Sequence, residues 1–390
     1  MSNPQQNSDV LIYVQHLLGI GHLRRAVALS NALVASGLKV TFVSGGFPVP
    51  GLEPEGADFI QLPPVRVEGE NFRVLIGEDG QEVDEAFRAG RRAQLLKLLE
   101  HCRPAALLTE MFPFGRRQMR FELDPLVAAA RDAGVLVISS IRDVLTTHKT
   151  PGKGEWILEK VQGEYDAVLV HGDPAFIRLE ESFPLAVHIP EKLHYTGYVL
   201  SETEAVSGPV EQDRREGVLV SAGGGAVAEP LIAAVLELSC HPDLPDDFKP
   251  DNCPWRILLG PNLSEESFAA FAKAASAGVE IERNRSDFTT LLGRARLSIS
   301  QAGYNTIMET LQAQTEAIVV PFHADTQSEQ TTRAEKLAER GLLSVVSEKE
   351  LSANSLLEAL KRRKRVPGLS LKVDGARESA HIIGQLLDRG

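Results

Sequence analysis

The sequence lacks the features that mark several specialised classes of protein. It has three cysteines, Cys102, Cys240 and Cys253, in no regular spacing, which argues against a disulfide framework and against a zinc site. No apolar run reaches the ~18 residues of a membrane span, and the polar start MSNPQQNSD has no apolar signal-peptide core. We therefore expect a cytoplasmic protein with reduced cysteines.

The sequence also lacks an excess of positive charge. Its 41 Lys and Arg stand against 53 Asp and Glu, for a net charge of -12, so we expect no nucleic-acid partner. The basic run KRRKR (361–365) is typical of a solvated helix end, with an anionic partner as the alternative. A chain of 390 residues with 43% hydrophobic residues is long enough for two globular domains.

Short apolar runs alternate with amphipathic helical patterns along most of the chain. This alternation predicts parallel sheets with helices on both faces. The runs that we expect to be strands are VLIYV (10–14), KVTFVS (39–44), AALLTE (105–110), VLVISS (135–140), DAVLVHG (166–172), GVLVSA (217–222), WRILLG (255–260), VEIER (279–283), RLSIS (296–300) and AIVVPF (317–322).

A change of composition divides the chain. Residues 201–216 are polar and acidic, so we interpret them as a linker, and the strand–helix pattern restarts at 217. The sequence thus predicts two doubly wound, Rossmann-like α/β domains that face a cleft, over 1–200 and 217–370. A helix over 371–390 is expected to pack back on the N-terminal domain.

The stretch LLGIGHLRRAVALSNAL (17–33) joins the first strand to a helix through two glycines, Gly19 and Gly21. It lacks the third glycine of a dinucleotide fingerprint, and the second strand ends in VSGG (43–46) without an acidic residue. No GK[ST] follows, which excludes a Walker loop. What remains is His22 at a helix N-terminus, where the dipole favours a neutral imidazole suited to general base catalysis. The alternative is that His22 only caps the helix.

Two later segments predict a binding edge. SAGGGAVAEP (221–230) places three glycines, Gly223, Gly224 and Gly225, before a helix, which is typical of an anion site or of a flexible turn. In SISQAGYNTIMETLQAQ (298–314), Glu309 either completes a capping box with Thr306 or accepts hydrogen bonds from a ribose diol.

Polar residues also follow a buried strand near residue 322. Glu329 and Gln330 come directly after it, which indicates a binding edge. The alternative for Glu329 is a helical ion pair with Arg333.

Charged residues at strand ends in the first half predict an acceptor site. Glu110 ends one strand; the alternative to a functional role is a surface carboxylate or one that is ion-paired, for example with Arg116. Arg116 lies in FPFGRRQMRFE (112–122), while Arg142 and Asp143 follow the next strand. These residues suit an anionic acceptor such as a phosphate-bearing lipid, and the alternative is a solvated basic loop.

Together these elements resemble glycosyltransferases of the GT-B fold, in the family that contains the peptidoglycan N-acetylglucosaminyltransferase and the plant galactolipid synthases. The motifs that carry the resemblance are AGYNTIMET (302–310), VVPF (319–322), EQTTRA (329–334) and the Gly-x-Gly-His loop at 19–22. The stretch TEMFPFGRRQMRFE (109–122) resembles a bacterial branch of these predicted transferases.

The resemblance implies a role for each donor-side motif. Glu309 would bind the ribose, Asn284 and Arg285 would border the nucleobase, and Glu329 and Gln330 would touch the donor sugar. The loop Gly223, Gly224 and Gly225 would cradle the phosphates through backbone N–H groups, because Gly224 stands where the family often has serine.

The expected reaction is the transfer of a hexose-type sugar from a nucleotide diphosphate sugar, with UDP as the nucleotide, to an acceptor hydroxyl. His22 is the first candidate for the base and Glu110 the second. No Asp-x-Asp occurs, so we expect a metal-independent, inverting enzyme without a cofactor.

The resemblance also implies a role in the cell envelope and peripheral contact with the inner face of the membrane. A nucleotide-sugar hydrolase that uses water as the acceptor, and a non-catalytic nucleotide-sugar-binding protein, are the alternative functions.

Overall fold

The computed structural model describes residues 8–17, 20–67, 74–145, 151–200, 215–222, 229–260, 263–285, 287–322, 329–363 and 372–389. Its contacts divide the chain into unit 1, Met1–Ser201 with Lys372–Gly390, and unit 2, Glu202–Leu371. The chain therefore leaves unit 1 once and returns to it at its end. The linker predicted over 201–216 lies largely outside the described residues.

Unit 1 is built on a parallel sheet of seven strands in the order β3-β2-β1-β4-β5-β6-β7. Ile12 of the central strand β1 pairs with Phe42 on one side and Leu108 on the other. Because both faces of this sheet are covered, its central strands read as continuous apolar runs. The strands are β1 Val10–Val14, β2 Val40–Ser44, β3 Asp58–Gln61, β4 Ala106–Glu110, β5 Leu136–Arg142, β6 Ala167–His171 and β7 Leu193–Tyr195.

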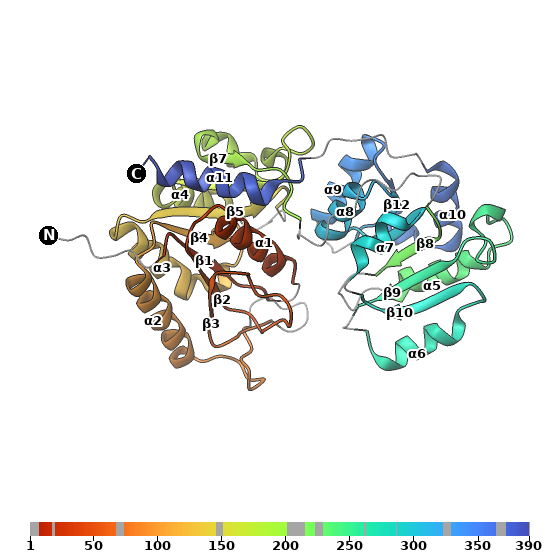
Figure 1. Ribbon diagram of the computed structural model, residues 1–390, viewed down its shortest axis with the longest axis horizontal. Helices are drawn as coiled ribbons and strands as arrows, with labels where there is room; N and C mark the ends of the chain where they lie inside the picture. The colour runs from red at the N-terminus through yellow and green to blue at the C-terminus, as the bar shows by residue number, and fades with distance from the viewer. Residues whose placement is uncertain are drawn as a thin grey trace. The chain divides into compact units, whose positions relative to one another are not determined.

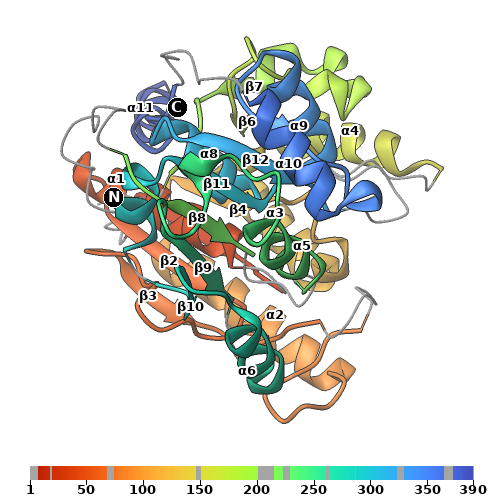
Figure 2. The same cartoon turned by 90° about the vertical axis from the view of Figure 1, so that its right-hand side faces the viewer.

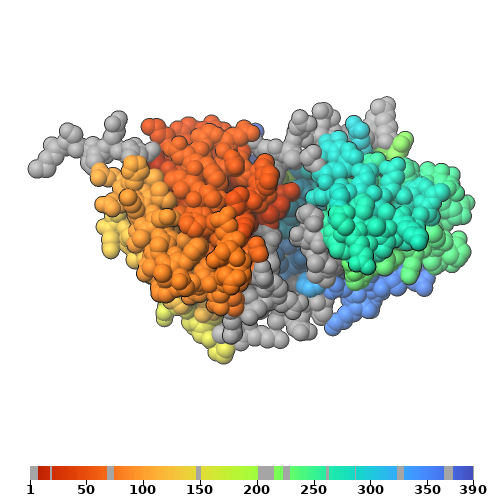
Figure 3. All heavy atoms as spheres, turned by 90° about the horizontal axis from the view of Figure 1, so that it is seen from below, coloured from red at the N-terminus to blue at the C-terminus, as the bar shows by residue number. Residues whose placement is uncertain are grey.

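Helices cover both faces of the unit 1 sheet. Helices α1 (Gly21–Ala35) and α11 (Gly375–Leu387) pack together on the face that carries Ile12 and Leu108, and Figure 1 shows them side by side. The opposite face carries the core of Leu11, Tyr13 and Leu107, which α2 (Glu85–Cys102), α3 (Arg120–Asp132) and α4 (Lys153–Glu164) cover. Seen from below, the orange segment containing α2 borders the redder segment around β2 and β3 on the surface of unit 1 (Figure 3).

Unit 2 is built on a second parallel sheet, of six strands in the order β10-β9-β8-β11-β12-β13, and Figure 2 labels its strands from β8 to β12. Trp255 and Phe248 are fully buried in its core. Its strands are β8 Val218–Ser221, β9 Trp255–Leu259, β10 Val279–Arg283, β11 Leu297–Gln301, β12 Glu316–Val320 and β13 Ser344–Val345. Its helices are α5 Glu229–Ser239, α6 Glu265–Ala274, α7 Phe288–Arg294, α8 Tyr304–Gln312, α9 Glu329–Glu339 and α10 Ala353–Arg362.

The prediction of doubly wound parallel-sheet α/β domains is confirmed by these two sheets. Helix α3 was not predicted, because it contains Pro125 and begins inside the basic, aromatic stretch 112–122. Pro125 has no N–H to donate to Phe121 O, and Arg92 Nη1 donates to that carbonyl instead, at 3.4 Å. Among the described helices, none combines the length and the apolar character that crossing a membrane requires.

Candidate active site

Polar side chains gather at the carboxyl-terminal edge of the unit 1 sheet. Glu110 ends β4, Arg142 ends β5 and His171 ends β6, while Thr196 directly follows β7. The register pairs Glu110 with Ser140 and Arg142 with His171. Because the strands are parallel and adjacent, all of these residues reach the same edge, where open α/β sheets bind their ligands.

His22 lies in the first turn of α1, above this edge. The helix begins at Gly21, and the other predicted turn residue, Gly19, lies outside the described residues. His22 Nδ1 is 2.9 Å from Glu110 Oε1. A carboxylate only accepts hydrogen bonds, so Nδ1 carries the proton, and the lone pair of Nε2 accepts from Arg142 Nη2. The imidazole is therefore a base held in one tautomer.

Glu110 is buried and receives donors on both carboxylate oxygens. Arg25 and His22 donate to Oε1, and the Ser140 hydroxyl donates to Oε2 at 2.7 Å. The ion pair of Glu110 is with Arg25, whereas Arg116 donates from Nε to Gln15 O at 2.6 Å. These donors fix both oxygens of Glu110 in place beside the imidazole.

The surroundings of His22 favour its neutral form. Burial lowers the pKa of His22 well below its usual value, and the positive charges of Arg116, Arg142 and Arg25 lower it further. Burial and Arg142 also lower the pKa of Arg116 to about 10. A neutral imidazole with its proton on Nδ1 has an unprotonated Nε2 near neutral pH, which a general base needs before it takes a proton from a substrate.

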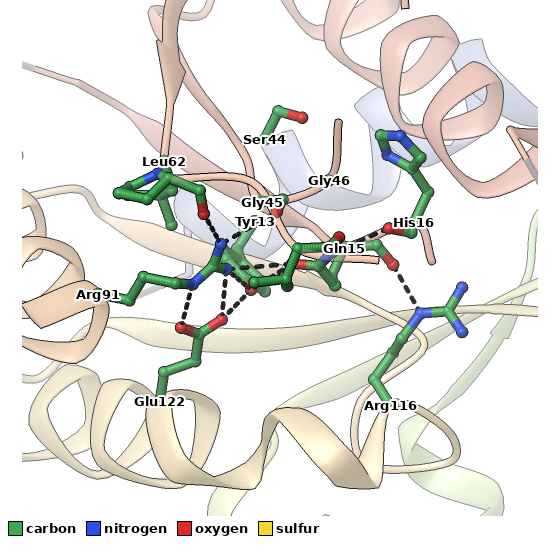
Figure 4. A network of polar contacts seen from close by, with 12 residues as sticks. Tyr13, Gln15, His16, Ser44, Gly45, Gly46, Leu62, Arg91, Arg116 and Glu122 are labelled. Carbon is green, nitrogen blue, oxygen red and sulfur yellow. Dashed lines mark hydrogen bonds and ion pairs between the residues drawn. The ribbon is translucent and has the colours of Figure 1, made fainter. Parts of the chain in front are cut away.

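A second polar network supports the loops beside this site (Figure 4). Arg91 and Glu122 form a fully buried two-pronged ion pair, with both N···O distances at 2.8 Å. Tyr13 donates to the same carboxylate, and Arg91 Nη1 donates to Gly45 O at 3.0 Å. This network ties β1, α2 and α3 to the loop that follows β2.

The glycines of that loop are required by close approach. A Cβ on Gly46 would overlap the His16 ring, and one on Gly45 would overlap Gln15 and Arg91. His16 Nε2 is 2.9 Å from Phe47 O, so the same ring anchors the loop. The VSGG motif, which holds no ribose-binding acid, thus brings this loop against the residues that follow β1.

Asp143 contributes to the turn after β5. It is fully buried, and its Oδ1 accepts from Val144 N–H at 2.9 Å. Gly172, after β6, packs against the Asp143 Cβ, where a side chain would not fit. Asp143 therefore shapes the edge that carries Arg142.

In unit 2, the predicted donor residues follow the carboxyl ends of strands. Glu309 is buried on α8 after β11. The helix is capped by Gly303 and Thr306 lies inside it, so the capping-box alternative is wrong. Glu329 begins α9, and Gln330 Oε1 accepts from Phe322 N–H at 3.1 Å.

The remaining donor-side predictions lie after β10 and β8. Asn284 N–H donates to Leu259 O at 2.9 Å, and the exposed Arg285 pairs with Asp287 and Glu282, at 2.8 Å in each pair. The predicted phosphate loop, Gly223, Gly224 and Gly225, lies outside the described residues. The structure thus places Glu309, Asn284, Arg285, Glu329 and Gln330 in one unit, without testing their roles.

The sequence interpretation missed Arg25, Ser140, His171 and Thr196 of the unit 1 site. Ser140 and His171 each lie at the end of an apolar run predicted as a strand, which is the signal that could have found them. Within the described part of the chain, no group of three or more His, Cys, Asp or Glu could hold a metal ion.

Comparison with known proteins adds sequence and fold relationships. Residues 218–367 match the family described as Glycosyltransferase family 28 C-terminal domain. The UDP-N-acetylglucosamine--N-acetylmuramyl-(pentapeptide) pyrophosphoryl-undecaprenol N-acetylglucosamine transferase of Paraburkholderia xenovorans is 34% identical over 100 residues, 26% of this chain and 27% of that protein. The protein of the same name in Burkholderia thailandensis is 32% identical over 104 residues, 27% of this chain and 28% of that protein. The match therefore spans about a quarter of the length of these relatives.

Solved structures extend the likeness to the whole chain. MurG from Acinetobacter baumannii superposes with a TM-score of 0.57 and 16% identity, over 98% of this chain and all of that one. UGT2 from Phytolacca americana, solved with UDP-2fluoro-glucose and pterostilbene, superposes with a TM-score of 0.60 and 14% identity, over 98% of this chain and 94% of that one. The two parallel-sheet units and these neighbours define a GT-B fold.

The family match lies in unit 2 and adds a sequence relationship to the fold. The resemblance to GT-B glycosyltransferases of the family that contains MurG, identified in the sequence, is therefore supported by the family match of residues 218–367, by the curated relatives and by the shared fold.

Proposed function

We propose that the protein is a glycosyltransferase that moves a hexose-type sugar from a UDP-linked donor to an acceptor hydroxyl, without a metal and with inversion. The observation that carries the proposal is the contact of the His22 imidazole with Glu110 at the sheet edge of unit 1, where burial lowers the pKa of His22. The names of the curated relatives, which specify a UDP-N-acetylglucosamine-dependent transferase, support the donor class.

His22 would act as the general base. As the acceptor oxygen attacks the anomeric carbon, its proton passes to His22 Nε2, and the bond from the anomeric carbon to the diphosphate oxygen breaks with its electron pair. The nucleoside diphosphate leaves, and attack opposite to it inverts the configuration. Arg142, which contacts Nε2, has to release it for this step. Glu110 then stabilises the imidazolium.

We assign Glu110 an indirect role instead of that of a second base. Glu110 is buried, and its two oxygens already accept hydrogen bonds from Arg25, His22 and Ser140. These contacts leave no exposed oxygen of Glu110 for a substrate hydroxyl, so Glu110 would act through the His22 ring.

The donor side of the proposal keeps the family roles. Glu309 would bind the ribose, the loop Gly223, Gly224 and Gly225 the diphosphate, and Asn284 with Arg285 the nucleobase. Glu329 and Gln330 would touch the sugar. Each of these residues follows a strand end of the unit 2 sheet, which is the ordinary ligand edge of such a fold.

Positively charged side chains surround His22 on the acceptor side. The charges of Arg116, Arg142 and Arg25 all lower the pKa of His22, and Arg25 also pairs with Glu110. A site of this kind suits an anionic acceptor, such as a lipid with a phosphate group near its hydroxyl. Such an acceptor implies peripheral contact with the inner face of the membrane.

A thermal-shift panel of nucleotides and UDP-sugars tests the donor assignment. A ligand at 100 times its dissociation constant stabilises its binding unit by about 2.7 kcal/mol. We expect UDP or a UDP-sugar to produce this shift, Glu309→Ala to abolish it, and Glu358→Ala, on the exposed face of α10, to keep it. A shift that persists in Glu309→Ala would contradict the donor site, and free sugar released without an acceptor would favour the hydrolase.

A further inference from the structure

A chain of buried hydrogen bonds crosses four adjacent strands of unit 1 behind Glu110. Ser140 Oγ is 2.7 Å from Glu110 Oε2 and 2.8 Å from His171 Nε2. His171 Nδ1 is in turn 2.9 Å from Thr196 Oγ1. Each strand from β4 to β6 contributes one side chain, and Thr196 follows β7. The chain ends on the carboxylate that holds His22.

The number of available protons fixes the direction of this chain. The Ser140 hydroxyl has one hydrogen, and a carboxylate can only accept, so Ser140 donates to Glu110. The Ser140 oxygen then accepts from His171 Nε2–H. A neutral His171 leaves Nδ1 as an acceptor, and the Thr196 hydroxyl donates to it. Every donor therefore points toward Glu110.

The alternative direction at Thr196 needs a second proton on His171. If the Thr196 hydroxyl donates to Gly197 O, 2.8 Å away, His171 has to donate from both nitrogens and carry a charge. Burial lowers the pKa of His171 well below its usual value, and the nearby Arg25 adds to the effect. The neutral arrangement is the one that this site favours.

Burial favours a single arrangement of this chain of hydrogen bonds. Ser140 and His171 are fully buried and Thr196 is 1% exposed, so water does not compete for these groups. Losing one member would leave a buried polar atom without its partner, which is unfavourable and selects a different side-chain position.

We infer that Ser140, His171 and Thr196 are positioning residues that lock the Glu110 carboxylate and thereby hold the proton of His22 on Nδ1. The catalytic part of this inference rests on the proposed function, because it concerns the availability of Nε2 to an acceptor hydroxyl. The tautomeric part stands on the geometry of unit 1 alone and can be tested without a substrate.

Nitrogen-15 NMR of the histidine rings tests the chain directly. Two-bond proton–nitrogen spectra of the wild type at pH 7.5 should show His22 protonated on Nδ1 and His171 on Nε2. Ser140→Ala should give His22 a mixture of tautomers. Ser139→Ala is the matched control, because its hydroxyl, on the adjacent buried residue, donates to Phe112 O at 2.8 Å instead. It should keep the wild-type pattern.

Thr196→Val and Thr196→Ser provide a second pair at the other end of the chain. The valine removes the hydroxyl and should change the His171 signals, whereas the serine keeps it and should preserve them. This pair keeps the test decisive if Ser140→Ala does not fold. A wild-type His171 protonated on Nδ1, or identical His22 signals in Ser140→Ala and Ser139→Ala, would overturn the inference.

Turnover of a UDP-sugar identified by the thermal-shift panel separates this inference from the proposed function. We expect Ser140→Ala to lower kcat about tenfold or more, with KM changed less than about twofold, since the loss acts on the base and not on binding. An unchanged kcat beside an altered His22 tautomer would overturn the catalytic part. No turnover by the wild type with any donor would count against the proposed function. The NMR result would still show whether the hydrogen-bond chain sets the tautomer of His22.

Discussion

At the scale of single residues, the site in unit 1 depends on two histidines that are kept neutral. Burial is the largest cause of the lowered pKa of both His22 and His171, and the Arg25 charge contributes to each. Glu110 is the acidic group that faces His22, with Arg116, Arg142 and His16 as its other charged or titratable neighbours. An unfolded histidine has a pKa of about 6.5, so below this pH the unfolded chain binds protons that the folded chain excludes.

This difference predicts that unit 1 loses stability as the pH falls from 7.5 to 5.5. Each excluded proton lowers the free energy of unfolding by about 1.4 kcal/mol at pH 5.5, and His22 and His171 together by nearly 3 kcal/mol. Urea unfolding of 5-fluorotryptophan-labelled protein, followed by fluorine NMR, resolves Trp156 in unit 1 from Trp255 in unit 2. The Trp156 transition should move to lower urea at the lower pH.

His22→Gln should remove the His22 part of this pH dependence, while His171, and His16 and His194, whose pKa burial also lowers, keep theirs. The control is His101→Gln, on the exposed surface of α2, which should retain the wild-type pH dependence. If the wild-type midpoint for Trp156 stayed constant between pH 7.5 and 5.5, the neutral, buried state of both histidines would be refuted.

At the scale of elements, the close packing of the loop after β2 predicts that an added methyl group destabilises unit 1 at Gly46 in this loop but not at Gly90 in α2. Gly46→Ala places a methyl group on the His16 ring, and the ring cannot shift freely because it is tied to Phe47 O. We expect a loss of about 1–3 kcal/mol in the free energy of unfolding of unit 1, from overpacking. The urea midpoint of the Trp156 signal measures it.

Gly90→Ala is the matched control for this loop. Gly90 lies inside α2, is exposed, and has nothing within 4 Å of an added Cβ. Alanine at such a position stabilises a helix by up to about 1 kcal/mol. Equal stability of Gly46→Ala and the wild type would contradict the close approach of this loop to His16.

Elements with a clear hydrophobic pattern could be predicted from the sequence, and others could not. VLIYV matches β1 residue for residue, because a strand buried on both faces is a continuous apolar run. The short edge strand β3, with the sequence DFIQ, is partly exposed and gives no such signal. Pro125 and the charged residues beside it interrupt the helical pattern of α3, so the sequence does not indicate this helix.

The candidate site could be predicted only in part, for a related reason. His22 and Glu110 stand at element ends beside motifs that single them out. Ser140 and His171 acquire their meaning only when β4, β5 and β6 become neighbours. That strand order is a long-range property, which local periodicity does not contain.

At the scale of the whole molecule, the chain closes unit 1 with its last helix. Helix α11 packs against α1, and its Ile383 and Ala380 are buried in the same core as Leu29. Residues more than 340 positions apart, such as Ala28 and Ile383, thus share one core. The stability of unit 1 should therefore depend on a segment that follows unit 2 in the sequence.

Reciprocal substitutions test this division of the chain. Ile383→Ala on α11 should destabilise unit 1 by about 2–5 kcal/mol, because it leaves a cavity beside α1. Leu360→Ala on α10, also fully buried, should impose a similar loss on unit 2. In the fluorine-NMR urea titration, the first variant should shift mainly the Trp156 midpoint and the second mainly that of Trp255. If Ile383→Ala shifted the Trp255 midpoint and left that of Trp156 in place, α11 would belong to the core of unit 2.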